Sequence, residues 1–225
     1  MEDKVAQEVK TKEQADNFMT EFAAQYNIEA RRLWDTLKAT AFRQKEGTVI
    51  TDAQMVALVL VAKAYNLNPF TKEIYAFPAK DGGIVPIVSV DGWRKIGYGN
   101  PDYAGHEIEY SEEMVTMPKS KPCPEWARIT IHKKSVSTPV VVTEYLDEVF
   151  RDLSYPNPWQ THPKRMLRHK TIIQGFREAF GFSGVHDEDE AERITEARDQ
   201  SWLKTEVEQP TKKEQEQRQE GEEKK

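Results

Sequence analysis

Apolar residues recur at helical spacing in the first third of the chain. Residues 12–45 show this spacing twice and predict two helices. Their apolar faces consist of Phe18, Phe22 and Tyr26 in the first helix and of Leu33, Trp34 and Leu37 in the second. Thr51 and Gln54 then form a capping-box pair, and the run Met55–Tyr65 behind them is apolar almost all round. This stretch therefore predicts a buried helix.

Two more helices are predicted towards the other end. Pro163–Phe180 has the length and spacing of a long helix, with proline suited to its first turn and Gly181 to its end. A last helix is predicted over residues 187–204. Residues 205–225 are dominated by Lys, Glu, Gln and Arg, and this composition predicts a disordered charged tail.

Segments rich in β-branched and aromatic residues lie between these helices. Residues 73–77 and 84–90 predict a hairpin across the turn residues 79–83, with Pro86 placing the second strand at an edge. Asp91 is predicted to cap a short helix that carries Trp93 and Ile96. Three further strands are predicted over His106–Tyr110, Trp126–His132 and Pro139–Tyr145.

The composition confines the chain to the globular class. Apolar residues make up 38% of it, and five Trp, eight Tyr and nine Phe supply the bulk for a core. The longest apolar runs are too short to predict a membrane-spanning helix, and residues 1–20 lack the apolar segment of a secretory signal. The single Cys123 excludes an intramolecular disulfide and a multi-cysteine zinc site, and a reducing intracellular setting is the expectation.

The net charge of −6 is spread unevenly. The chain has 38 acidic and 32 basic residues, and residues 187–225 hold 14 and 8 of them, which leaves 24 of each in residues 1–186. Within that neutral body, residues 151–180 carry six basic residues against two acidic ones. Because local potential decides what a surface binds, a polyanionic partner remains open despite the acidic total.

The segment His162–Lys170, with the sequence HPKRMLRHK, concentrates this basic charge. On a helix that continues from this segment, one apolar side would carry Met166, Ile173, Phe176 and Phe180. The opposite side would carry Lys164, Arg168, Thr171 and Gly175. A cationic ridge at a helix N-terminus, with a glycine that permits close approach, suits phosphate groups. The alternative is an amphipathic helix whose basic face is only solvated, and the pattern alone leaves both open.

Other candidate sites have simpler explanations. The aromatic and basic residues of 70–77 and 91–95 could stack bases, but rings in such segments more often fill a core. The acidic run over residues 186–190 could suggest a metal site, yet consecutive residues on a helix point in different directions, and an acidic first turn suits the helix dipole. The sequence has no HExxH motif and no phosphate-binding loop, and Cys123 has no evident base, so no catalytic constellation is indicated.

Two long blocks of sequence are distinctive, NLNPFTKEIYAFP at residues 66–78 and HPKRMLRHK at residues 162–170. Shorter blocks accompany them in order along the chain, at Gly83–Pro86, Val90–Trp93, Pro158–Gln160, Phe180–Phe182 and Asp189–Ile194. Together they resemble the Bet branch of the RecT-like phage recombinases, a family of single-strand annealing proteins. The resemblance is strongest over residues 37–186. It fades after Ile194, and we expect the family's separate C-terminal domain to be absent or reduced to a short charged tail.

The resemblance implies an α+β fold, with helices packed on a small antiparallel sheet. It implies an oligomerising annealing core over residues 1–186, followed by the predicted helix and tail. The implied function is ATP-independent binding of single-stranded DNA and annealing of complementary strands in phage homologous recombination. An oligomeric ring or helical filament would act on the DNA without enzymatic catalysis.

The resemblance also implies partners and a setting. The partners would be single-stranded DNA, the annealed duplex intermediate and further copies of the chain, in the cytoplasm of a bacterial host. The family works with a phage 5′–3′ exonuclease and the host single-strand binding protein, and the reduced C-terminal region leaves these two partnerships open here. No tightly bound cofactor is implied, and Mg²⁺ would act only as a modulator.

Finally, the resemblance assigns cations that contact DNA. They are Lys72, Lys80, Lys134, Arg151, Lys164, Lys170 and Arg177. The helix argument alone adds Arg165 and Arg168, and Arg43 stands where the family can carry lysine.

Two other functions remain open, a module that coats strands without speeding their pairing and a Mg²⁺-dependent nuclease built on the acidic residues 187–190.

Overall fold

A computed structural model describes residues 20–24, 27–43, 48–79, 82–153 and 156–197 of the chain. Its helices are α2 (Ala30–Thr40), α3 (Asp52–Ala64), α4 (Val90–Tyr98), α5 (Leu146–Val149), α6 (Pro158–Thr161) and α7 (Pro163–Phe180). Its strands are β1 (Ile74–Pro78), β2 (Ile84–Val88), β3 (Tyr103–Tyr110), β4 (Met114–Val115), β5 (Cys123–Pro124), β6 (Trp126–Lys133) and β7 (Val140–Tyr145). Residues 20–24 and 188–197 are also helical.

These elements confirm the predicted α+β class, with helices on small antiparallel sheets. The oligomerising role of the core stays a prediction, and the tail predicted over residues 205–225 lies outside the described residues. No helix in the described part of the chain is long and apolar enough to cross a bilayer.

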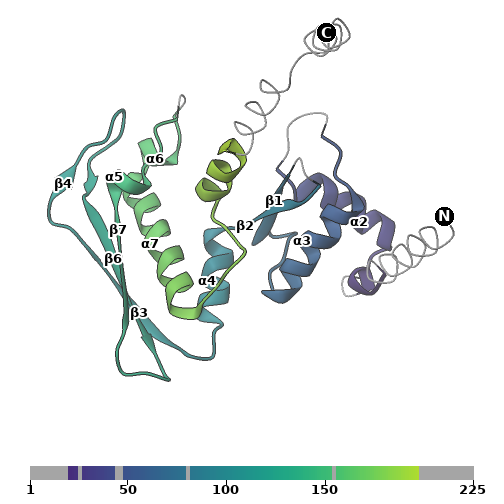
Figure 1. The fold of residues 1–225 in the computed structure, drawn as a ribbon, viewed down its shortest axis with the longest axis horizontal. Coiled ribbons are helices and arrows are strands. Elements are labelled where there is room, and N and C mark those ends of the chain that lie inside the picture. Colours follow the sequence, from purple (N-terminus) through teal and green to yellow (C-terminus); the bar gives the residue numbers. More distant parts are fainter. Residues whose placement is uncertain (1–19, 25–26, 44–47, 80–81, 154–155, 198–225) are drawn as a thin grey trace, which may run out of the picture.

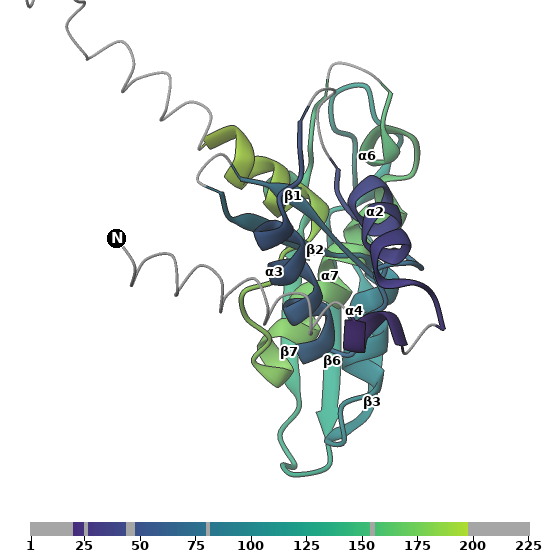
Figure 2. The ribbon, with the colours of Figure 1, turned by 90° about the vertical axis from the view of Figure 1, so that its right-hand side faces the viewer.

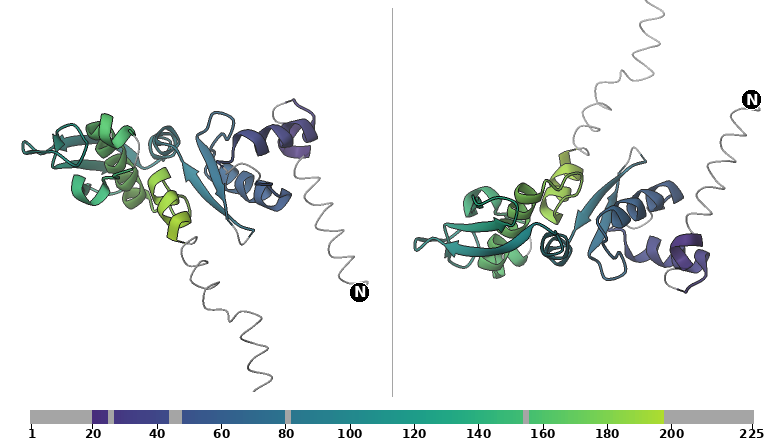
Figure 3. Two further views of the ribbon diagram at one scale, coloured as in Figure 1. Left: turned by 90° about the horizontal axis from the view of Figure 1, so that it is seen from above. Right: turned by 90° about the horizontal axis from the view of Figure 1, so that it is seen from below.

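The elements lie in successive layers (Figure 1). A three-stranded sheet in the order β3-β6-β7 is covered by α7, and α4 packs on α7. The hairpin β1-β2 comes next, and α3 and α2 complete the row. Figure 3 shows the same row from above and below. The helical residues 188–197 lie beside the hairpin, where Ala191 packs with Val85 and Ile87.

Strand β6 forms the centre of the larger sheet. Its residues Ala127, Ile129 and Ile131 are fully buried and alternate with partly exposed ones, as expected for a strand with one face against a helix. Ile129 pairs with Ile108 of β3 on one side and with Val142 of β7 on the other. Figure 2 shows the turn between β6 and β7 extending beyond the helices.

Local sequence signals predicted several helix ends correctly. Thr51 Oγ1 accepts a hydrogen bond from Gln54 N at 3.2 Å, and Thr51 N donates to Gln54 Oε1 at 3.1 Å, which is the predicted capping box. Helix α7 has the predicted bounds and ends at Gly181, whose φ of 68° favours glycine. The cap of α4 is a correction, because Ser89 Oγ accepts from the third residue of the helix and Asp91 lies within the first turn.

The N-terminal helices agree with the prediction in part. Leu33, Trp34 and Leu37 are buried in α2, which confirms the second predicted helix. Of the first, the structure describes residues 20–24, and the predicted face residues Phe18 and Tyr26 lie outside the described residues. Helix α3 is less buried than predicted, since Leu60 is 51% exposed. Its contacts with α2, β1 and β2 leave another part of its surface open.

Helix α7 is covered on more sides than its sequence indicated. The sheet packs on one side, α4 on another, and the residues that follow the helix on a third. Thr171 and Gly175 are therefore buried, and a Cβ at Gly175 would lie 2.5 Å from Ile129 Cγ2. The prediction that Gly175 admits a phosphate backbone is wrong, because this glycine lets α7 approach β6.

The substitution Gly175→Ala is expected to lower the free energy of unfolding by about 1–3 kcal/mol, because the new methyl group must displace Ile129. On a solvated helix surface the same change would raise stability by about 1 kcal/mol, since alanine is the better helix former. Urea unfolding followed by circular dichroism gives the sign. A stabilised variant would show that this glycine does not face the sheet.

Candidate nucleic-acid interface

The basic segment begins where two helices meet. Asn157 Oδ1 accepts a hydrogen bond from Trp159 N at 2.8 Å and caps α6, and the buried Trp159 anchors this short helix. His162 interrupts the helical path with a φ of −140°, and Pro163 then starts α7. The first turn of α7 is thereby placed at the surface of the protein, next to α6.

A pocket of about 640 Å³ opens at this end of α7. We call it the basic pocket, and its lining consists of Arg94, Tyr110, Lys121, Pro122, Thr161, His162, Pro163, Lys164, Arg165, Arg168 and His169. Five of these residues are lysine or arginine, two are histidine and none is acidic. They come from α4, from β3, from the segment between β4 and β5, and from the end of α6 through the start of α7.

Arg94 of the basic pocket has a carboxylate partner, since its Nη1 lies 3.3 Å from Asp91 Oδ1, but the pocket cations on α7 have none in the part of the chain that the structure describes. Lys164, Arg165 and Arg168 are exposed, and within the described residues no ion pair joins them to a carboxylate. Lys164 Nζ lies 5.7 Å from the centre of the Tyr110 ring, a cation–π contact that leaves its charge in place. The N-terminus of α7 adds a favourable dipole for anions. Phosphate groups therefore match this pocket in charge.

His169 contributes little of this charge at neutral pH. Burial lowers the pKa of His169, and the neighbouring Arg94, Arg165 and Arg168 lower it further. Because the usual value is 6.5, the His169 imidazole is mainly neutral at pH 7. The lysines and arginines of the pocket therefore act on phosphate without help from His169.

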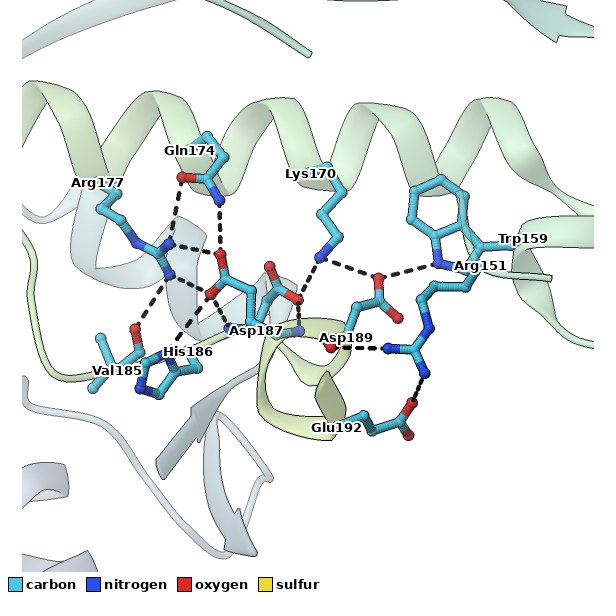
Figure 4. Close-up of polar contacts among 11 residues, drawn as sticks. Arg151, Trp159, Lys170, Gln174, Arg177, Val185, His186, Asp187, Asp189 and Glu192 are labelled. Carbon is cyan, nitrogen blue, oxygen red and sulfur yellow. Dashed lines mark hydrogen bonds and ion pairs between the residues drawn. The ribbon is translucent and has the colours of Figure 1, made fainter. Parts of the chain in front are cut away.

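Lys170, to which the resemblance also assigns a DNA contact, lies inside the protein. It is 7% exposed, and its Nζ lies 2.5 Å from Asp187 Oδ1 and 3.1 Å from Asp189 Oδ2 (Figure 4). Asp187 is itself 4% exposed. An external phosphate can reach Lys170 only if these carboxylates move away. Here Lys170 binds the segment that follows α7.

Arg177 makes a second contact of this kind, also drawn in Figure 4. Its Nη1 lies 2.8 Å from Glu190 Oε1, and its Nη2 lies 2.8 Å from Oε2 and 3.2 Å from the carbonyl oxygen of Val185. Gln174 Nε2 donates to Glu190 Oε1 at 2.9 Å. The hydrogen bond to Glu190 raises the pKa of Arg177, and the guanidinium lies 5.2 Å from the centre of the Trp93 ring.

Arg151 and Arg43 contact the same acidic segment. Arg151 is 8% exposed, and its Nη1 donates to the carbonyl oxygen of Asp189 at 3.1 Å while Nη2 lies 3.2 Å from Glu196 Oε1. Arg43 forms an ion pair with Glu188. Four cations connected with DNA by the resemblance thus bind carboxylates or carbonyls of residues 185–196. We call this group of interactions the ion-pair cluster.

The remaining residues predicted to contact DNA lie elsewhere. Lys72 is exposed in the turn between α3 and β1, and Lys134 is exposed in the turn that follows β6. The neighbouring Lys133 donates to the carbonyl oxygen of Ala179, near the C-terminal end of α7, so Lys134 and the basic pocket lie at opposite ends of that helix. Lys80 lies outside the described residues. Of the nine predicted residues, Lys164, Arg165 and Arg168 are brought together in the pocket.

Sequence reasoning did not assign Arg94, Tyr110 or Lys121 to the site, although all three line the pocket. Arg94 belongs to the segment 91–95, whose ring was interpreted as part of the core. That segment has two roles in the structure, since Trp93 is fully buried while Arg94 lines the pocket. The amphipathic spacing of α4 was the available signal. Lys121 and Tyr110 carried no local signal, because folding alone brings the loop after β4 and the end of β3 to the first turn of α7.

The acidic run after α7 has a structural role. Asp187 Oδ1 accepts from Glu190 N at 3.1 Å, and Asp187 N donates to Glu190 Oε2 at 3.3 Å, which forms a capping box at the start of the helical residues 188–197. Among the described residues no group of acidic, histidine or cysteine side chains is arranged to hold a metal ion. The Asp187 and Glu190 carboxylates bind backbone N–H groups, Lys170 and Arg177.

The ion-pair cluster predicts acid-sensitive stability. Burial alone would raise the pKa of Glu190, but the hydrogen bonds and charge of Arg177 lower it from 4.5 to about 2. Because the folded state has the lower pKa, this stabilisation is present above pH 4.5 and is lost as the pH falls towards 2. We expect Glu190 to contribute up to about 3 kcal/mol to the free energy of unfolding above that interval.

Urea unfolding at a series of pH values through this interval measures the effect. The variant Glu190→Gln lacks the titrating group, so its stability should be lower at neutral pH and should depend less on pH. Parallel pH profiles for the two proteins would contradict the assignment.

The basic pocket and the ion-pair cluster both lie in the part of the chain that matches known proteins. The model of the RecT family matches residues 29–202, which is more than half of the chain. The chain is also 44% identical over 177 residues to the recombination protein bet of Escherichia phage lambda. That alignment covers 76% of this chain and 62% of the relative, so the chain spans less than two thirds of that protein's length.

Proposed function

This chain belongs to the RecT family, and from that premise we propose that it binds single-stranded DNA and anneals complementary strands during phage recombination. One observation carries the proposal, the basic pocket at the N-terminus of α7 with five lysine or arginine residues and no acidic residue in its lining. The similarity to a recombination protein of phage lambda supports the recombination setting.

Phosphate contacts suit annealing because they leave base edges free to pair. Lys164, Arg165 and Arg168 can each neutralise a phosphate without reading its base. Binding should therefore be independent of sequence and should weaken steeply as salt concentration rises. Nothing in this mode of binding requires a covalent step, and base pairing supplies the free energy, so ATP is not needed.

Annealing also requires many nucleotides to be presented together. A single-strand binding module usually covers about 4–16 nucleotides, which is short for a stable duplex. We therefore propose that several copies line up on DNA, as a ring or a helical filament. No tightly bound cofactor is needed, and Mg²⁺ would act by screening phosphates.

The proposed setting is the cytoplasm of a bacterial host, with single-stranded DNA and the annealed duplex intermediate as partners. A phage exonuclease and the host single-strand binding protein are expected from the family resemblance. Because the chain spans 62% of the length of its lambda relative, we propose these two partnerships separately from DNA binding and annealing.

Two complementary oligonucleotides, one with a fluorophore and one with a quencher, test the proposed function. We expect the purified chain to quench the fluorescence faster than spontaneous pairing does, without any nucleoside triphosphate. A protein that binds each strand yet leaves the pairing rate unchanged would be a coat protein instead. Shortened strands on a denaturing gel in the presence of Mg²⁺ would indicate the nuclease alternative.

A further inference from the structure

A group of aromatic rings continues the basic pocket along α4 and β3. Tyr98 lies one helical turn after Arg94, and both belong to α4. His106 lies four residues before Tyr110 on β3, so these two side chains point to the same face of that strand. Arg94 and Tyr110 line the basic pocket, and Tyr98 and His106 continue from them along the same two elements, just outside that lining.

The rings of Tyr98 and His106 are stacked on each other. Their centroids are 5.8 Å apart and their planes differ by 13°. The Tyr103 hydroxyl lies 2.6 Å from His106 Nδ1, which fixes the orientation of the imidazole. Phe176 meets the Tyr98 ring edge-on at 5.5 Å, with an interplanar angle of 88°. A contact within β3 and a contact from α7 thus hold the pair in place before any ligand arrives.

Tyr98 keeps a large part of its surface accessible despite these contacts. Its side chain is 45% exposed, whereas Trp93 on the same short helix is fully buried. The core contacts of Tyr98 therefore leave part of its ring accessible to a ligand. An exposed ring next to cations is the combination that proteins use to bind single strands, because every base has a face that can stack.

The charge around this pair also favours DNA. Burial lowers the pKa of His106, and the pocket residues Arg168 and Arg94 lower it further, so their field reaches the imidazole. The acidic residues Glu107 and Glu109 of the same strand alternate with His106 and point to the opposite face of the sheet. Strand β3 therefore presents no carboxylate beside the rings.

We propose that Tyr98 and His106 form a stacking platform for a base of single-stranded DNA whose phosphates occupy the basic pocket. The platform rests on the proposed function and adds a base-stacking interaction to it. A base that lies flat on this platform keeps its Watson–Crick edge exposed, so stacking orients the base without blocking its pairing with the second strand.

The test compares two single strands of equal length, an oligothymidylate and its abasic counterpart with the same number of phosphates. Base stacking contributes about 1–3 kcal/mol for each base, so the wild-type chain should bind the thymidylate strand at least about fivefold more tightly. In the variant Tyr98→Leu this preference should disappear, while the affinity for the abasic strand stays the same.

Two control variants make the comparison specific. Tyr98→Phe retains the ring and should retain the preference. Tyr145→Leu removes a tyrosine of similar exposure, 43%, from β7, and should also retain it. A full preference for the thymidylate strand in Tyr98→Leu would overturn the platform. If the wild-type chain bound neither strand, the proposed function itself would fail, and the two failures are thus distinguishable.

Photocrosslinking of the wild-type chain covers the case in which Tyr98→Leu does not fold. A strand containing 5-iododeoxyuridine should form its crosslinks at Tyr98 or His106. Crosslinks found only at other residues would overturn the proposal, whatever the behaviour of the variant.

Discussion

The substitution Lys170→Ala is expected to lower the free energy of unfolding by about 3–5 kcal/mol. Lys170 is the buried partner of Asp187, and the alanine would leave that carboxylate inside the protein without its ion pair. It would also remove the ion pair of Lys170 with Asp189, and so loosen the helical residues 188–197 from α7. Urea and thermal unfolding followed by circular dichroism measure the loss of stability.

An exposed lysine of the same helix provides the matched control. Lys164→Ala should change the free energy of unfolding by less than about 0.5 kcal/mol, because Lys164 is solvated and has no carboxylate partner among the described residues. Replacing both members of the buried pair, in Lys170→Met with Asp187→Leu, should recover part of the lost stability. A Lys170→Ala protein as stable as the wild type would contradict the buried ion pair.

The double substitution Lys164→Ala with Arg168→Ala is expected to weaken binding of single-stranded DNA at least about tenfold at low salt, with folding unchanged. Removing a cation that neutralises one phosphate should also make the slope of log affinity against log salt shallower by about 0.7, so the two substitutions together should reduce it by about 1.4. Fluorescence anisotropy of a labelled oligonucleotide over a series of salt concentrations gives both quantities.

The control for this experiment removes the same charge from another surface. Lys63 in the last turn of α3 and Arg193 in the helical residues 188–197 are exposed and lie outside the basic pocket. Changing both to alanine should leave the slope close to that of the wild type. An equal loss of affinity in the two double variants would mean that net charge, and not the pocket, governs binding.

Local signals in the sequence were enough to predict several helix ends. The capping box of Thr51 and Gln54 and the span of α7 between Pro163 and Gly181 depend on neighbouring residues alone. Strands β3, β6 and β7 were predicted within a few residues, because alternating and β-branched patterns record one buried face. The capping residue of α4 differed, since Ser89 and Asp91 are both good caps and tertiary contacts decide between them.

The burial of individual cations could not be predicted from the same patterns. A helical wheel treats α7 as two-sided, whereas the sheet, α4 and the residues after the helix enclose it on three sides. Lys170 and Arg177 therefore face carboxylates that follow 10–20 residues later in the chain, and nothing local reveals that pairing. For the same reason Arg94 and Lys121 join the basic pocket only through folding.

Accessibility divides the predicted DNA contacts that the structure describes in and around α7. Lys164, Arg165 and Arg168 can meet a phosphate in the structure as it stands. Direct contact by Arg151, Lys170 or Arg177 requires the acidic residues 187–196 to move. The assignment of these three remains a prediction, and the stability of the ion-pair cluster sets the free energy that such a movement would cost.

The rate of annealing in the Lys164→Ala, Arg168→Ala protein tests the central claim most directly. Complementary oligonucleotides with a fluorophore and a quencher are mixed with the wild-type chain, with this variant and with the Lys63→Ala, Arg193→Ala control at equal concentrations of folded protein. We predict rapid pairing with the wild type and the control, and a rate close to spontaneous pairing with the pocket variant. Undiminished annealing by the pocket variant would contradict the account.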